Sequence, residues 1–175
     1  MSSLDDLYRK VIMDHYQSPR NRGQLPDADA TIQLKNPSCG DQIQLQLKIE
    51  DGHIRDAKYD GEGCSISMAS ASMMTEAIIG KQVDEALDLA NRFSKMMVGE
   101  DVDTTGFEDI EALQGVCKFP ARIKCATLSW KAMEKGICER CDYDLECGCH
   151  KHPLTDAETD DGAISEVKIA DSATE

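Results

Sequence analysis

The sequence predicts an α+β fold in which a small three-stranded antiparallel sheet packs against about five helices. Segments with alternating apolar residues occur between residues 32 and 59, and the pair Asp51-Gly52 among them is typical of a two-residue hairpin turn. Segments with apolar residues at helical spacing lie on both sides of this region. A chain of 175 residues suits one such domain.

The first part of the chain is predicted to form one helix and three strands. The helix begins after Ser3, whose spacing to Asp6 matches a capping box, and it ends before Pro19, because the residue ahead of a proline avoids the helical conformation. A loop covers residues 17–29. Apolar and polar residues then alternate over 32–34 and 43–49, which predicts two strands with one buried face each, and residues 54–59 supply the third strand across the hairpin turn.

The helices that follow the sheet begin with a cysteine. Cys64 stands at the start of a helix that reaches about residue 79, with Ser65 or Ser67 as its cap, and the position favours a thiolate because of the helix dipole. The next helix is predicted over residues 83–98 and stops at Gly99.

The last predicted helix follows an acidic stretch over residues 100–111 and a short helical turn closed by Gly115. It begins at Pro120, a residue that suits the first helical position, and ends at Gly136. Apolar residues line two of its sides, so we expect it to be buried on both.

Composition limits the partners. A net charge of -14 argues against nucleic acid or anionic lipid, because phosphate binding depends on clustered Lys and Arg. No apolar run approaches the ~20 residues that cross a bilayer, and the N-terminal residues lack the order of a signal peptide, so a cytosolic protein is expected. Eight cysteines in a reducing compartment favour metal binding or thiol chemistry over disulfides.

Cys39, Asp41, Cys64 and Cys125 are the candidate site. Cys39 and Asp41 precede the first strand of the hairpin and Cys64 follows its second, so the antiparallel pairing should bring them to the same end of the sheet. Cys125, in the last helix, could cover that end. Three thiolates and one carboxylate complete the ligand set of a tetrahedral zinc ion. The alternative is that the cysteines are only small buried apolar residues.

Three segments carry a resemblance to the IscU/NifU-like iron-sulfur assembly family. They are Asn36-Pro37-Ser38-Cys39-Gly40-Asp41, Gly61-Glu62-Gly63-Cys64-Ser65-Ile66-Ser67 and Lys118-Phe119-Pro120-Ala121-Arg122-Ile123-Lys124-Cys125. The opening residues from Leu7-Tyr8-Arg9 to Ser18-Pro19-Arg20-Asn21 resemble the family too, so the match covers about residues 4–136. The insertion over residues 99–115 is similar to one that the SufU branch carries. Lys124 also points to that branch, since the scaffold branch has a histidine there.

The resemblance implies a zinc-dependent sulfurtransferase. In SufU-like proteins the four ligands hold zinc, and a SufS-type cysteine desulfurase docks and displaces the cysteine that corresponds to Cys39. That cysteine accepts the persulfide sulfur and relays it to cluster assembly machinery of the SufBCD type. Arg122, one turn before Cys125, is expected to help the desulfurase dock, with a solvated surface residue as the alternative.

Two other functions remain open from the sequence. The same thiols could hold a nascent iron-sulfur cluster, which would make the protein a non-enzymatic scaffold. A purely structural zinc domain is less well supported, because closed structural sites prefer Cys and His ligands and Asp41 is neither.

Residues beyond the family match define two further segments. Residues 137–152 contain a possible second metal site, whose donors are Cys138, Cys141, Cys147, Cys149, His150 and His152; the alternative is a tail with reduced, unoccupied thiols. Residues 153–175 hold seven carboxylates against the single Lys168, which predicts an acidic disordered tail. Cys117 is expected to be a buried bystander, or else a substitute ligand. The predicted domains are therefore 1–136, 137–152 and 153–175.

Overall fold

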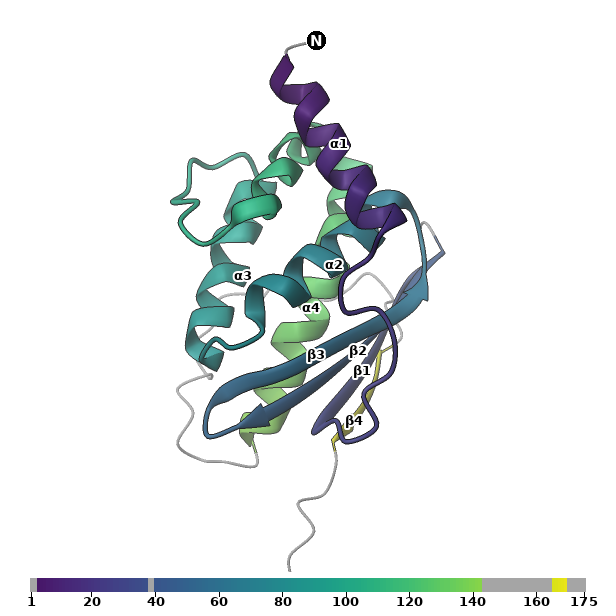
Figure 1. Ribbon diagram of the computed structural model, residues 1–175, viewed down its shortest axis with the longest axis vertical. Coiled ribbons are helices and arrows are strands. Elements are labelled where there is room, and N and C mark those ends of the chain that lie inside the picture. The colour runs from purple at the N-terminus through teal and green to yellow at the C-terminus, as the bar shows by residue number, and fades with distance from the viewer. Residues whose placement is uncertain (1–2, 38–39, 143–164, 170–175) are drawn as a thin grey trace, which may run out of the picture.

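The computed structural model describes residues 3–37, 40–142 and 165–169, and within them five helices accompany one antiparallel sheet (Figure 1). This confirms the predicted α+β class. Helices α2 (Ser65–Ile78) and α4 (Pro120–Asp142) pack against the sheet. Helix α1 (Ser3–Gln17) packs on α2, and α3 (Val83–Met97) packs on α4. The 3-10 helix η1 (Glu108–Lys118) contacts all four.

The three predicted strands are present, and their register positions the residues of the candidate site. They are β1 (Ala30–Asn36), β2 (Asp41–Glu50) and β3 (His53–Glu62). Positive φ angles at Asp51 and Gly52 form the predicted turn between β2 and β3. Gln42 pairs with Glu62, so the start of β2 lies beside the end of β3, as the hairpin argument required.

A fourth strand corrects the expectation of a structureless tail. Strand β4 (Ser165–Ile169) pairs antiparallel with β1, which gives the sheet the order β3-β2-β1-β4. Val167 and Ile169 alternate with the polar Glu166 and Lys168, and β1 offers the segment an unpaired edge. A short alternating segment within an acidic tail therefore gains backbone hydrogen bonds that composition did not predict.

Three helix ends differ from the prediction. The cap of α2 is Cys64 itself, not Ser65 or Ser67. Helix η1 continues past Gly115 to Lys118. Helix α4 continues past Gly136 to Asp142, across the predicted domain boundary at residue 136. No helix in the described ranges is both long and apolar enough to span a bilayer.

Gly136 serves packing and does not end the helix. A Cβ atom added there would collide with Ile32 Cδ1 and lie 3.4 Å from Leu47 Cδ1. Because Gly136 has no side chain, helix α4 can lie closer to β1 and β2 at this position than it could with a larger residue there.

Helix α4 is buried on two sides, as predicted, and one polar group links it to α2. Trp130 stacks on Phe93 of α3 with ring centroids 4.5 Å apart. Its indole Nε1 donates to Ser70 Oγ at 3.1 Å, and that hydroxyl donates to the carbonyl of Ala126 at 2.6 Å. Burial also raises the pKa of Glu134 to about 7.

Candidate metal centre

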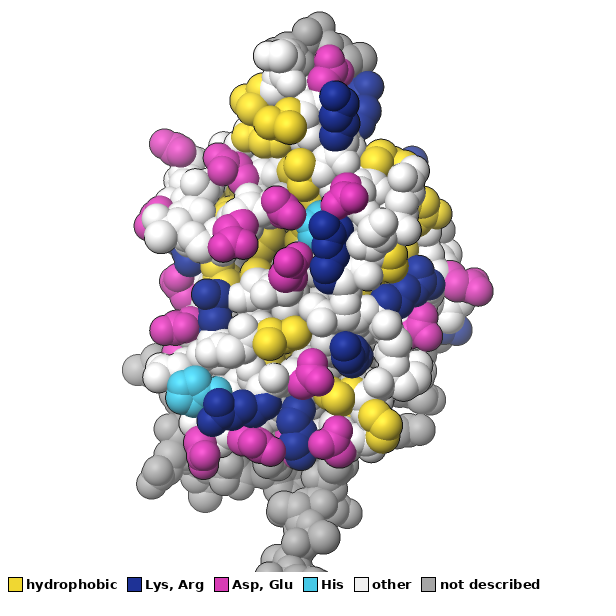
Figure 2. Space-filling view, in the orientation of Figure 1, with side chains coloured by type: hydrophobic (Ala, Val, Ile, Leu, Met, Phe, Trp, Pro, Cys, Tyr) yellow, Lys and Arg dark blue, Asp and Glu magenta, His cyan; other side chains and the backbone are white. Residues whose placement is uncertain are grey.

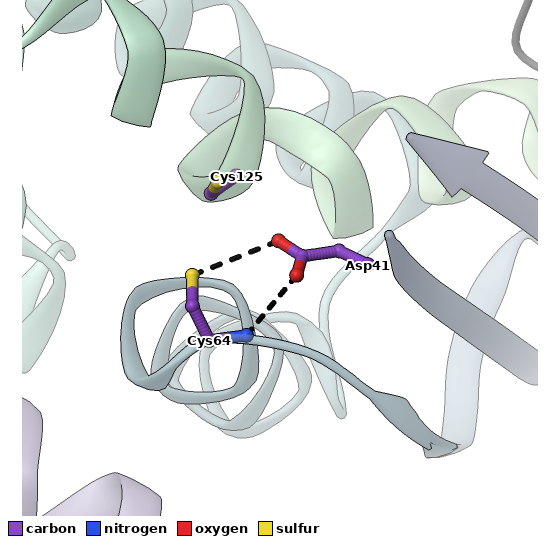
Figure 3. Close-up of side chains that lie close together, drawn as sticks. All are labelled: Asp41, Cys64 and Cys125. Atoms are coloured by element: carbon purple, nitrogen blue, oxygen red, sulfur yellow. Dashed lines mark hydrogen bonds between the residues drawn. The ribbon is translucent and has the colours of Figure 1, made fainter. Parts of the chain in front are cut away.

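Asp41, Cys64 and Cys125 come together from three elements. Asp41 is the first residue of β2, Cys64 caps α2, and Cys125 lies in the second turn of α4. One ligand atom from each lies within 4.8 Å of the other two, and the side chains point toward one another (Figure 3). The convergence predicted from the sequence is thus observed for these three residues.

Asp41 and Cys64 are joined by two contacts. The backbone N–H of Cys64 donates to Asp41 Oδ1 at 3.1 Å, and Cys64 Sγ lies 3.6 Å from Asp41 Oδ2. A sulfur and an oxygen bound to one tetrahedral zinc at about 2.3 and about 2.1 Å would stand roughly 3.6 Å apart. The observed separation therefore already suits two ligands of one ion.

Burial differs among the three side chains. Asp41 and Cys125 are buried, and Cys64 is partly exposed. Cys64 Sγ accepts a hydrogen bond from the backbone N–H of Ser67 at 3.5 Å. The group therefore has two candidate ligands in the interior and one that is partly open to solvent.

Ser67 and Gly63 complete the surroundings of Asp41. Ser67 is the third residue of α2. In a capping box the side chain at this position accepts the backbone N–H of the N-cap residue, but here the N-cap N–H, that of Cys64, donates to Asp41. Ser67 Oγ is buried and has no hydrogen-bond partner within the described parts of the chain. A Cβ on Gly63 would lie 2.5 Å from Ser67 Oγ and 3.0 Å from Asp41 Oδ1.

These two residues were not predicted as part of the site. Ser67 is suggested by the sequence as a helix cap, and both residues belong to the second segment that resembles the family, but neither was predicted to contact the site. The signal for Gly63 is its place directly before a cysteine at a helix start, where any side chain would enter the site.

Arg122 lies beside the site, as expected. The negative charge of a Cys64 thiolate, followed by a hydrogen bond to Cys125, raises the pKa of Arg122. The guanidinium itself is exposed. An exposed cation held against two ligand cysteines can attract an anionic group toward them.

Other predicted site residues are only partly covered. Cys39, in the turn between Asn36 and Asp41, lies outside the described residues. Cys138 lies half-buried on α4 against the core, whereas the side chains of Cys141, Cys147, Cys149, His150 and His152 lie outside the described residues. Cys117, on η1, is half-buried and does not belong to either group of metal-capable side chains in the described ranges.

Comparisons with known proteins agree on the family and the fold. The NifU-like N-terminal domain family matches residues 7–126. A zinc-dependent sulfurtransferase SufU from Bacillus subtilis is 59% identical over 137 residues, covering 78% of this chain and 92% of the relative. An iron-sulfur cluster assembly scaffold protein IscU from Streptococcus pyogenes is 47% identical, covering 78% of this chain and 86% of the relative.

A solved structure is also similar. It is described as a putative iron-sulfur cluster assembly scaffold protein for the SUF system from Fervidobacterium islandicum, and it superimposes with a TM-score of 0.71 at 35% identity. The alignment covers 73% of this chain and 94% of that one.

Proposed function

The chain belongs to the NifU-like N-terminal domain family of iron-sulfur cluster assembly, and on that basis we propose that it is a zinc-dependent sulfurtransferase. It would accept persulfide sulfur from a SufS-type cysteine desulfurase and relay it to assembly machinery of the SufBCD type. The proposed compartment is the cytosol, where the eight thiols stay reduced.

The observation that carries the proposal is the arrangement of Asp41, Cys64 and Cys125. The Cys64 Sγ to Asp41 Oδ2 distance of 3.6 Å suits zinc, and two thiolates with one carboxylate suit its ligand preferences. Cys39 is the proposed fourth ligand. The Ser67 hydroxyl, buried near the carboxylate and without a hydrogen-bond partner among the described residues, is available to donate to a ligand of the ion.

In the proposed reaction Cys39 is the sulfur acceptor. Bound zinc would hold its thiol deprotonated at neutral pH without redox chemistry of its own. The Cys39 thiolate attacks the terminal sulfur of the desulfurase persulfide, a new S–S bond forms, and the old S–S bond breaks. The desulfurase cysteine leaves as a thiolate, so no external oxidant or reductant is needed.

Arg122 is proposed to guide the desulfurase to the site. Its side chain is exposed beside Cys64 and Cys125, and Phe119, directly before the first residue of α4, is 62% exposed. A cation next to an exposed aromatic ring is a favourable anchor for a partner protein. Arg122→Ala should therefore weaken desulfurase binding and leave zinc content unchanged.

A scaffold function is the second candidate, and the Streptococcus relative carries that name. In it the same thiols would hold a nascent cluster. Position 124 argues against the scaffold function. The scaffold branch has a histidine there, whose ring nitrogen can bind the cluster. This chain has an exposed lysine instead, a group with no acceptor when charged.

Desulfurase turnover tests the proposal. Adding the wild-type protein to a SufS-type desulfurase should raise alanine production from cysteine, and mass spectrometry should find an added sulfur atom on Cys39. Cys39→Ala should abolish both effects. Cys117→Ala removes a thiol outside the site and should retain them. Unchanged turnover with wild type, or equal stimulation by Cys39→Ala, would show that the proposal is wrong.

Metal analysis separates transfer from scaffolding. Protein purified without oxygen should contain one tightly bound zinc at the site that includes Asp41, Cys64 and Cys125. A chromophoric iron centre at these residues would favour the scaffold instead.

A further inference from the structure

A second group of metal-capable side chains lies well away from the cysteines. His15 near the end of α1, Glu76 on α2 and Asp109 on η1 each place one ligand atom within 4.8 Å of the other two. We propose that these three residues form a second metal site, which takes a divalent cation of the Mn²⁺ or Fe²⁺ kind.

His15 is held in the orientation of a metal ligand. Its ring is completely buried, and Nδ1 lies 2.8 Å from Ser72 Oγ. That hydroxyl also accepts the backbone N–H of Arg20 at 2.9 Å, so it is itself fixed in place. A histidine that binds a metal through one ring nitrogen is commonly held through the other. The ring therefore keeps Nε2 directed at the carboxylates.

The carboxylates face solvent around this buried nitrogen. Asp109 Oδ2 lies 2.8 Å from His15 Nε2, with the Asp109 side chain 52% exposed, and Glu76 is exposed as well. Adjacent ligands on one octahedral ion stand roughly 3 Å apart. Asp109 would need to withdraw by only a few tenths of an ångström, which an exposed side chain can do, and water could fill the remaining positions.

Local charge favours a cation. Arg20 is ion-paired to Asp14 at 2.7 Å, and it also interacts electrostatically with Glu76 and Asp109. One guanidinium is therefore shared among three carboxylates. Figure 2 shows further acidic side chains gathered over the insertion between α3 and η1. A divalent cation would offset this excess of negative charge.

The donor types indicate which ions fit. One imidazole and two carboxylates suit Mn²⁺ and Fe²⁺, and the set has no thiolate to select softer ions. Glu76 follows Cys64 by twelve residues on the same helix, so the two sites lie roughly 18 Å apart along α2. Each site can therefore be loaded and assayed separately.

Mn²⁺ is the probe of choice, because it binds thiolate sites poorly and is followed directly by electron paramagnetic resonance. The full chain, first loaded with zinc, should bind one saturable equivalent of Mn²⁺. Glu76→Gln and Asp109→Asn, both at exposed positions, should each weaken that binding at least tenfold. Glu85→Gln, on α3, removes the same charge away from the site and should bind Mn²⁺ as wild type does.

Nuclear magnetic resonance gives a second measurement. Mn²⁺ should broaden the ring signals of His15 at concentrations that leave those of His53, on β3, sharp. The proposal is wrong if no equivalent is saturable, or if both variants at the site bind as wild type does. Neither result bears on the zinc-dependent sulfur transfer, which is measured with the desulfurase.

Discussion

Gly63→Ala is expected to weaken zinc binding without a general loss of stability. Gly63 does not have a positive φ angle, so alanine suits its backbone, and the effect comes from the added methyl group alone. That group would lie 2.5 Å from Ser67 Oγ and 3.0 Å from Asp41 Oδ1. The metal-free protein can relieve both contacts by turning the side chains of Ser67 and Asp41 away from the methyl group. In the zinc-bound protein Asp41 is held by the metal, so its contact with the methyl group remains.

The magnitude follows from this difference. Overpacking in a closely packed interior costs about 1–3 kcal/mol. If the metal-bound form alone bears that strain, zinc affinity falls by about 5- to 150-fold, since about 1.4 kcal/mol is a tenfold change. Competition with a chromophoric chelator measures the affinity, and Gly115→Ala is the control because its Cβ meets nothing within 4 Å. Wild-type zinc affinity in Gly63→Ala would show that the added methyl group does not strain the metal-bound form.

Three further changes test the packing of α4. Glu134→Gln should remove a pH dependence of the unfolding free energy. Burial raises the pKa of Glu134 in the folded protein from 4.5 to about 7. Ionisation of Glu134 therefore destabilises the fold increasingly between these pH values, and by about 3 kcal/mol above them. Urea unfolding at pH 5 and pH 8 should therefore show the variant gaining stability only at the higher pH, and an equal gain at both would contradict this. Gly136→Ala should lower the unfolding free energy by about 1–3 kcal/mol through its contact with Ile32, as measured by thermal melting, and an unchanged melting temperature would be evidence against close approach. Ser70→Ala should cost a similar amount, about 1–3 kcal/mol, because the Trp130 indole N–H loses its acceptor, whereas Ser70→Thr, which keeps the hydroxyl, should cost less in the same assay.

The sequence was sufficient where residue pattern and local geometry agree. Alternation and the Asp51-Gly52 turn predicted the hairpin, and the antiparallel pairing then predicted that Asp41 and Cys64 would meet. In the structure Arg122, one turn before Cys125 in sequence, interacts with both Cys64 and Cys125.

The failures share a physical cause, since each depends on a partner distant in sequence. Gly136 looks like a helix end by local rules, yet its role is set by Ile32, more than a hundred residues earlier. Ser67 looks like a helix cap until Asp41 takes the N–H of Cys64. His15 has two partners, on α2 and η1, and neither could be found from its neighbours in sequence.

Strand β4 also has a consequence for self-association. An unpaired edge strand can accept a strand from another molecule, and here β1 accepts residues 165–169 of its own chain in continuous register. The same hydrogen bonds would form if β4 of one copy paired with β1 of a second, which is a domain-swapped dimer. Because a tethered strand is present at an effective concentration of about millimolar, the closed monomer should prevail in dilute solution, and exchange should become competitive only in very concentrated samples.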